Sequence, residues 1–457
     1  MVPITTYYLN PKDFGVFAIL SAVTMPIGPL ASTGVTWVLA GNYHTTNESQ
    51  RKILFFNILL LDFVLKSFWI FVFWLSSPLL LPIIIKDFEL RYGFYFKLSL
   101  ISALLTAFWP SISYFIILQQ KGRIHAIFEV SQWVGGALVT ISCLTILKFS
   151  TITLFLGPLA SGVISCVTSL WYVRNYINPK LSKKWLMEIF KIGIPSIPLN
   201  LFEMITNISD RYFIQRWDNL YQLGIYTHSL NYKSIFTMGS RAFIRTFSPY
   251  AIETFSKGFD RKNLAQKIIK WYGLLGITGI FIVLFSYEIV NILTHGKFVS
   301  AAPLVPIWFL LILSFAYGTL YTQFLVVHKK NTFMVYSGLL INIFFIGITA
   351  IFIYKFGIMG GVISIVLSNF ITQLSRRIYA TKLSCEVIGE KEFLSIVSII
   401  LGVYIVHAFF NFDIIKKILI CFFLSTFIAN RYALIAVIKV NSRKVLAYLA
   451  AWKLKKF

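Results

Sequence analysis

A few charged side chains interrupt the long apolar runs of this chain, and their types and spacing could do chemistry. Asp62 and Lys66 lie four positions apart in the apolar run 53–76, so on a helix they share one face and can pair. An ionised group deep in a membrane-spanning helix costs at least about 2.5–3.5 kcal/mol, so it needs a partner or a watery cavity. The pair is therefore either a self-neutralising structural contact or part of a polar site.

A second group of charges occupies two successive apolar runs, 187–213 and 222–244. Its members are Glu203, Asp210, Arg211, Lys233 and Arg241. If both helices present Arg211 and Lys233 to a central cavity, the cavity is positive and favours an anionic cargo, most simply a phosphate group. Arginine suits this role because its planar fork can hold two phosphate oxygens. We predict Arg211, Lys233, Lys66 and Arg241 as substrate-binding residues, with a purely structural role as the alternative.

The other candidate residues have equally simple structural explanations. We predict coupling or structural roles for the acidic residues Asp62, Glu129, Glu203 and Asp210; Glu129 and Glu288 lie close enough to helix ends to reach the interface. Two proline pairs remove backbone donors and should bend their helices, as hinges or as packing kinks; they are Pro195 with Pro198 and Pro26 with Pro29. No cluster of His and Cys with metal-ligand spacing is present, so we expect no metal and no cofactor.

The composition requires a membrane. Of the 457 residues, 57% are hydrophobic and only 13% charged, and the repeated apolar runs of about 20 residues suit bilayer-spanning helices. A net charge of +25 would suggest nucleic acid in a soluble protein. Here the basic residues gather in short loops between apolar runs, which the positive-inside rule explains, so no nucleic acid partner is expected. No enzyme signature is found.

The apolar runs predict thirteen spans and a sidedness. The more basic alternating loops, which include Lys121, Arg174 and 257–270, should face the cytoplasm. The opposite loops hold Lys12-Asp13, the mixed segment from Lys86 to Arg91, and Asp218. The predicted spans are 14–40, 53–76, 94–118, 126–147, 152–173, 187–213, 222–244, 268–293, 304–327, 333–354, 358–378, 393–411 and 414–434.

Two segments of the first half return in the second half in the same order. Phe14–Phe17 resembles Leu223–Tyr226, and Gly162–Val167 resembles Gly361–Val366. Such internal duplication in a very apolar chain indicates two lobes with a site between them. Because a long apolar run precedes only the second copy, we expect the first lobe to lack its opening helix; either the start is assigned too late or the chain is a truncation, and the sequence leaves open whether the native start lies upstream of Met1.

The predicted fold class is an all-α integral membrane protein. It has two pseudo-repeated six-helix lobes, the first helix missing, plus about two extra C-terminal helices. The predicted domains are an N-terminal transmembrane lobe, a C-terminal transmembrane lobe, and additional helices with a basic amphipathic tail, over 1–178, 179–385 and 386–457.

Three segments carry a resemblance to a known family. They are Tyr8–Phe17; the midpoint pieces Ile192–Pro198, Ser209–Phe213 and Gly224–Tyr226; and Lys329–Thr332, Asn342 and Lys355–Gly361. In this order they resemble the Wzx-type polysaccharide flippases, or O-antigen transporters, of the multidrug/oligosaccharidyl-lipid/polysaccharide exporter superfamily.

The resemblance implies a twelve-helix core in two lobes around a central cationic cavity, open alternately to each side. The implied cargo is an undecaprenyl-diphosphate-linked oligosaccharide, moved across the bacterial inner membrane for the synthesis of O-antigen, and hence of lipopolysaccharide, or of a similar polymer. Arg211 occupies the family's Asp-Arg position, which implies a role near the diphosphate. H⁺ or Na⁺ and the polysaccharide polymerase machinery remain candidate partners, and the missing first helix departs from the family.

Three alternatives stay open. A cation-coupled multidrug antiporter of the same superfamily should carry acidic residues in its first lobe, where only Asp62 and Glu129 qualify. A flippase of a lipid-linked peptidoglycan precursor differs only by a weaker motif match. A membrane polysaccharide polymerase should have a large outer loop for its catalytic groups, and the outer loops here are short.

Overall fold

The computed structural model describes residues 2–432 except 32–37, 40–41, 44–45, 258–260, 384, 386–388 and 411. The chain forms two compact units, and each unit is made of three separate segments of the sequence. The first comprises Met1–His228, Leu293–Lys297 and Ile346–Gly361, and the second comprises Ser229–Ile292, Phe298–Phe345 and Val362–Phe457.

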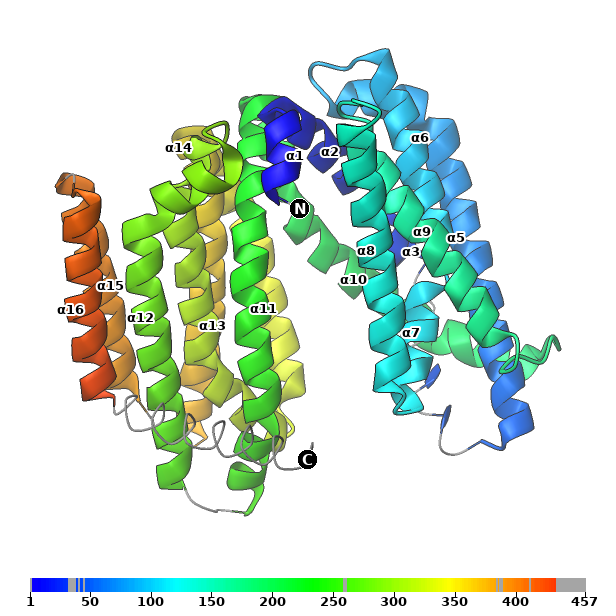
Figure 1. Cartoon of the computed structure of the whole chain (residues 1–457). Helices are drawn as coiled ribbons and strands as arrows, with labels where there is room; N and C mark the ends of the chain where they lie inside the picture. Colours follow the sequence, from blue (N-terminus) through cyan, green and yellow to red (C-terminus); the bar gives the residue numbers. More distant parts are fainter. Residues whose placement is uncertain are drawn as a thin grey trace, which may run out of the picture. The chain divides into compact units, whose positions relative to one another are not determined.

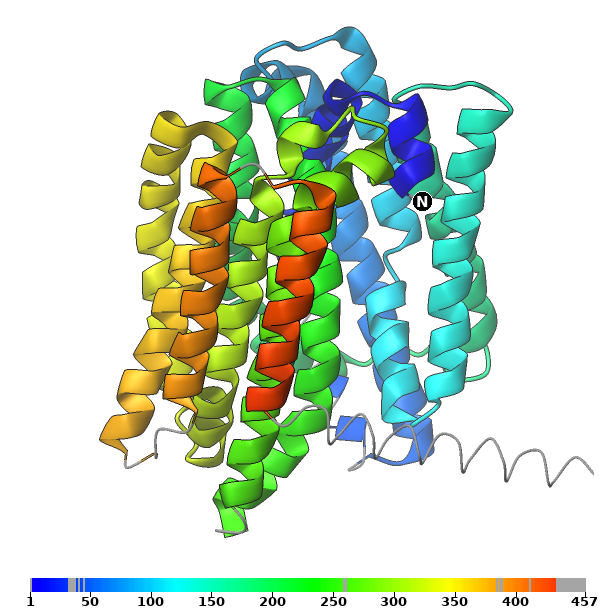
Figure 2. The same cartoon turned by 60° about the vertical axis from the view of Figure 1, so that its left-hand side comes forward.

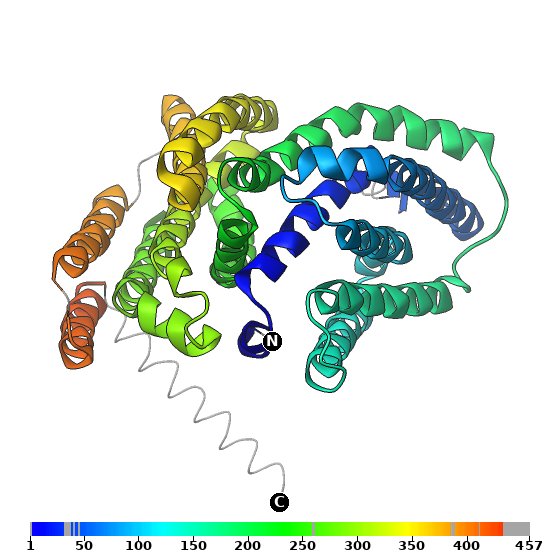
Figure 3. The same ribbon diagram turned by 90° about the horizontal axis from the view of Figure 1, so that it is seen from above.

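The first part of the chain folds into a set of helices (Figure 1), and α8 and α9 pack through small residues. Helix α9 packs along both α8 and α6, and Figure 3 shows α8 beside α9. A Cβ at Gly136 of α8 would lie 2.9 Å from the Gly157 carbonyl of α9, so only glycine permits this closeness. The helices are α1 (Val2–Tyr8), α2 (Pro11–Thr24), α3 (Ile27–Leu30), α5 (Glu48–Ile84), α6 (Leu90–Leu105), α7 (Trp109–Leu118), α8 (Gly122–Thr145) and α9 (Thr153–Val173).

The second part contains longer helices, of which α15 and α16 lie side by side (Figures 1 and 2). The longest, α14, breaks at Gly357, where φ is 57° and ψ is −143°. That break confirms the prediction of separate spans over 333–354 and 358–378. The elements are α10 (Lys183–Trp217), α11 (Leu220–Lys257), α12 (Arg261–Thr294), the 3₁₀ turn η1 (Val299–Ala301), α13 (Leu304–Val327), α14 (Asn331–Lys382), α15 (Glu390–Phe409) and α16 (Ile414–Arg431).

The fold class predicted from the sequence is confirmed as an all-helical membrane protein. Within the described part of the chain, eight helical segments are long and apolar enough to cross a bilayer. The long helices α10 and α11 are not among the eight. Charges such as Asp210, Arg211, Lys233 and Arg241 lower their hydropathy, and these are the residues singled out by the sequence.

Two predicted spans are found as membrane-spanning segments, Leu90–Leu118 and Pro11–Leu30, but each contains a helix break; residues 32–37 and 40 of the predicted span 14–40 lie outside the described part of the chain. The run 94–118 breaks between α6 and α7, because Pro110 lacks an N–H and its ring excludes an unbroken turn before it. The run 14–40 breaks at Met25 and Pro26, between α2 and α3. The division into lobes at residue 178 stays a prediction.

Candidate functional site

Asp62 and Lys66 lie on one face of α5, as predicted, and both bind groups at the break between α6 and α7. The Lys66 ammonium donates to the Ala107 carbonyl at 2.5 Å, and the Ser111 hydroxyl donates to the buried Asp62 carboxylate. A helix break at Pro110 leaves backbone carbonyls without intrahelical donors, and such groups need a partner inside a membrane. Lys66 supplies one, so its ammonium has a structural contact in this conformation.

Arg211 lies next to a buried polar pair formed across the turn from α10 to α11. The Tyr226 hydroxyl donates to the Asp210 carboxylate, and Asp210 is only 4% exposed. The other Asp210 oxygen accepts the Arg211 backbone N–H at 2.7 Å. Among the described residues, the buried Nε of the Arg211 guanidinium has no hydrogen-bond partner. The Asp210 carboxylate therefore makes two structural contacts, and the Nε of Arg211 keeps a donor available.

Lys233 and Arg241 lie further along α11, in the second compact unit. The Lys233 ammonium is 4.6 Å from the centre of the Trp308 ring, a cation–π distance. The buried Trp308 indole donates to the Ser229 hydroxyl at 2.9 Å, which fixes the ring. Arg241 is exposed. The four cationic candidates are thus divided between the units, with Lys66 and Arg211 in the first.

The remaining candidate residues are an exposed glutamate, two prolines at a helix break, and three residues whose side chains are not described. Glu129 is half-exposed and pairs with His125 at 3.6 Å, one helical turn away. Pro26 precedes α3 and Pro29 lies within it, at the break that follows α2. Helix α10 runs through Pro195, Pro198 and Glu203, whose side chains lie outside the described part of the chain.

Glu288 of α12 forms an ion pair that sequence reasoning did not anticipate. The Lys417 ammonium of α16 donates to its carboxylate at 2.6 Å. Lys417 is only 5% exposed, so a largely buried ion pair joins α16, the last described helix, to α12.

The duplicated glycines Gly15 and Gly224 lie at one helix crossing. A Cβ built on Gly15 of α2 would lie 1.9 Å from the Leu220 carbonyl oxygen of α11. A Cβ on Gly224 of α11 would lie 1.7 Å from the Pro11 carbonyl oxygen of α2. Each carbonyl belongs to the residue four positions before the other glycine, so the contact is reciprocal. The two helix starts touch backbone to backbone, as small residues allow in membranes.

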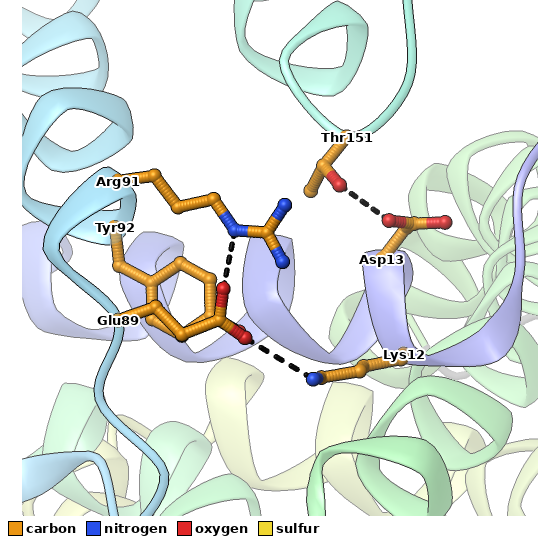
Figure 4. Close-up of polar contacts among 6 residues, drawn as sticks. All are labelled: Lys12, Asp13, Glu89, Arg91, Tyr92 and Thr151. Atoms are coloured by element: carbon orange, nitrogen blue, oxygen red, sulfur yellow. Dashed lines mark hydrogen bonds and ion pairs between the residues drawn. The ribbon is translucent and has the colours of Figure 1, made fainter.

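A polar cluster surrounds the start of α2 (Figure 4). Glu89, before α6, accepts from Lys12 at 3.2 Å, from the Tyr92 hydroxyl at 2.7 Å, and from Arg91. The Thr151 hydroxyl, before α9, donates to Asp13. The hydrogen bonds from Arg91 and Tyr92 lower the pKa of the Glu89 carboxyl to about 2. These contacts tie the start of α2 to α6 and α9.

The sequence indicates outer loops for the charged members of this cluster but gives no sign that they meet. It assigns Lys12, Asp13, Glu89 and Arg91 to loops on one side, which is compatible with their contact. It gives no role to Tyr226, whose place in the repeated Gly-Ile-Tyr segment is the available signal.

These features define a class: an all-helical membrane protein with a close, glycine-mediated helix crossing and ionisable groups inside its helices. Solved structures share the fold. The lipid II flippase MurJ, in an inward closed conformation, aligns with a TM-score of 0.73 and 11% identity, over 96% of this chain and 95% of that one. An inward-facing multidrug resistance MATE family transporter of the MOP superfamily aligns with a TM-score of 0.69 and 14% identity, over 84% and 94%.

The family is shown by the sequence itself. The profile described as polysaccharide biosynthesis protein matches residues 7–303, more than half of the chain, so the chain belongs to that family. No curated protein sequence matches the chain significantly. The resemblance drawn from the motifs is thereby confirmed.

Proposed function

We propose that this protein is a flippase that moves an undecaprenyl-diphosphate-linked oligosaccharide across the bacterial inner membrane. The observation that carries the proposal is the family match over residues 7–303, which links the chain to polysaccharide synthesis. MurJ, whose fold this chain shares, is named as a flippase of lipid II.

Arg211 is the residue we assign to the diphosphate. Its Nε is buried and has no acceptor among the described residues, although the neighbouring Asp210 is bonded to Tyr226. A buried guanidinium donor that lacks an acceptor carries a desolvation cost. A phosphate oxygen would supply the acceptor with a charge-assisted hydrogen bond.

The other three cationic candidates differ in the contacts that their side chains already make. Lys233 rests on the ring of Trp308 and Arg241 is exposed, so both can add positive charge to a cargo path. Lys66 is bonded to the Ala107 carbonyl, and it meets cargo only if that bond breaks during transport.

Alternating access supplies the mechanism. The diphosphate binds to the cations, the sugars follow, and the lipid tail remains in the bilayer while the protein changes conformation. Pro26, Pro29, Pro195 and Pro198 are proposed bending points, and H⁺ or Na⁺ is a proposed coupling ion. The polymerase machinery would receive the product. No bond in the cargo is made or broken, so the protein is not an enzyme.

The alternative is a cation-coupled multidrug antiporter. The MATE transporter has the same fold, and Asp62 is a buried carboxylate in α5 that a coupling ion could use. An antiporter predicts drug or sodium sensitivity in a strain without the gene, with its surface polymer unchanged.

The test uses a strain that lacks the gene and a plasmid copy of the chain. Arg211→Gln should lower polymer export by about tenfold or more, the loss expected for charge-assisted hydrogen bonds of about 1.5–3 kcal/mol. Arg216→Gln removes the same charge from an exposed position near the end of α10 and should export normally. Lipid-linked intermediates, surface polymer and membrane levels of each variant are measured together.

The outcomes separate the hypotheses. Lipid-linked intermediates that accumulate with Arg211→Gln, at a normal membrane level, support the flippase and the site. Normal export by that variant removes Arg211 from the site. If deletion of the gene leaves the polymer unchanged but alters drug sensitivity, the flippase assignment is wrong and the antiporter replaces it.

A further inference from the structure

A cavity opens where α8 begins and α9 ends, inside the first compact unit. Its volume is about 290 Å³, and its wall includes Trp171, Tyr172, Arg174, Asn175 and Tyr176. None of these residues is used in the transport proposal. The cavity therefore requires a separate explanation.

The wall of the cavity is rigid and aromatic. The Tyr172 and Tyr176 rings stack with centroids 5.2 Å apart, and Phe128 packs edge-on against Tyr172 at 5.8 Å. The Tyr172 hydroxyl donates to Gln119 at 2.5 Å, which fixes its ring. Trp171 is 59% exposed at the end of α9, the place where tryptophan marks the membrane interface.

The cavity carries positive charge. The Arg174 guanidinium is 5.7 Å from the Trp171 ring centre. The Lys121 ammonium donates to the Tyr176 hydroxyl at 2.8 Å, and this hydrogen bond lowers the pKa of Tyr176. Among the described residues, no carboxylate forms an ion pair with Lys121 or Arg174. The nearby Glu129 pairs with His125 instead.

The location and the volume of the cavity indicate which class of ligand it can bind. The cavity lies at the ends of two apolar spans, Gly122–Thr145 and Thr153–Val173, the level at which lipid headgroups lie. Its volume is at the low end of small-molecule sites, about 300–1,000 Å³, so it admits a headgroup but not an oligosaccharide. The exposed Ile127 side chain beside it offers an apolar surface for acyl chains.

We propose that this cavity binds the headgroup of an anionic phospholipid. Arg174 binds the phosphate, Asn175 offers its amide to the glycerol hydroxyls, and the stacked tyrosines form the floor. Lys121 holds Tyr176 in place and adds a second positive charge. The site is independent of the cargo path, so its failure would leave the flippase proposal untouched.

Native mass spectrometry of the full-length protein in detergent tests the site. Phosphatidylglycerol and phosphatidylethanolamine with identical acyl chains are the two probes. The wild-type protein should retain phosphatidylglycerol in preference, and Arg174→Gln should weaken that retention about tenfold, the equivalent of one charge-assisted hydrogen bond. Lys121→Gln should give a smaller loss. Lys382→Gln, at an exposed position near the end of α14, is the matched control and should bind normally.

Three results would overturn the proposal. Equal retention of both lipids by the wild-type protein means that only acyl chains bind. Unchanged phosphatidylglycerol retention in Arg174→Gln means that the lipid lies elsewhere. Undecaprenyl diphosphate that displaces phosphatidylglycerol from the wild-type protein, and binds Arg174→Gln less well, means that the cavity belongs to the cargo. Arg174 is exposed, so the variant should fold, and surface polymer export should be unchanged.

Discussion

The starts of α2 and α11, which the sequence predicts to be copies of one segment, make matching backbone contacts but different polar contacts. Both helices begin after an asparagine, Asn10 or Asn219. Asn10 donates its backbone N–H to Asp13 at 2.9 Å, and the Asn219 side chain accepts the Gln222 N–H at 2.9 Å. Both then reach a glycine in contact with the other helix.

The polar contacts that follow the two glycines differ in how deeply they are buried. The first segment is held partly by an exposed ion pair, in which Lys12 contacts Glu89. The second segment has a buried hydrogen bond, because Tyr226 stands where the first has Phe17, and its hydroxyl binds Asp210. Phe17 packs on Phe155 at 5.4 Å instead. Both segments thus share the backbone contact, and the second places the buried Asp210 carboxylate beside Arg211.

The largest expected effect on stability comes from adding a Cβ atom at either glycine of the crossing between α2 and α11. Gly15→Ala or Gly224→Ala would put a Cβ within 2 Å of a carbonyl oxygen, so each should destabilise the protein by about 1–3 kcal/mol through overpacking. The double variant should cost less than the sum, because one separation of the helices relieves both clashes. Thermal unfolding in detergent measures these differences.

Gly239→Ala is the matched control for the crossing. Gly239 also lies in α11, and a Cβ there meets nothing within 4 Å. Alanine should be neutral or stabilising by up to about 1 kcal/mol, its advantage over glycine in a helix. If Gly15→Ala and Gly224→Ala behave like this control, the reciprocal contact does not exist.

An effect of similar size is expected from loss of the buried hydrogen bond between Tyr226 and Asp210. Tyr226→Phe converts this position to the residue of the first copy and removes the hydroxyl that binds Asp210. The loss of a hydrogen bond to a buried charge should cost about 1.5–3 kcal/mol. The control Tyr221→Phe, at an exposed tyrosine of the same helix, should change stability by less than about 0.5 kcal/mol. Equal effects in both variants would refute the asymmetry between the copies.

The smallest effect is expected from the exposed contacts of the first copy. Glu89→Gln should cost less than about 1 kcal/mol at neutral pH, as surface ion pairs do. The pKa of Glu89 is lowered from its ordinary value of 4.5 to about 2. Its stabilising contribution is therefore complete above pH 4.5 and is lost as the pH falls through about 2. The difference in melting temperature between wild type and Glu89→Gln should be constant from neutral pH to 4.5 and then shrink. A difference that stays constant down to pH 2 would contradict the assignment.

Local signals in the sequence predicted the elements well and their contacts poorly. The span 304–327 coincides with α13, and the glycine at 357 marks the break in α14, because hydropathy and glycine act locally. Pro110 was an equally local signal that sequence reasoning overlooked. The contacts of Glu89 with Lys12 and of Tyr226 with Asp210 depend on how helices meet, which no single run of residues encodes.

The predicted pairing of Asp62 with Lys66 illustrates the same limit within the candidate site. Spacing on one helix predicted a shared face, and both residues lie on it. The partners that decide their role, Ala107 and Ser111, come from a break in a different segment.

The ion pair between Lys417 and Glu288 has a consequence for how the protein is made. Glu288 is synthesised 129 residues before Lys417, so α12 is available when α16 leaves the ribosome. An ionised lysine that is buried in a membrane protein needs a partner. Lys417 lies in the first turn of α16, which carries three basic residues and is not among the eight candidate spans. We expect α16 to enter the membrane as the companion of α12, so that the order of synthesis supplies the partner that its lysine needs.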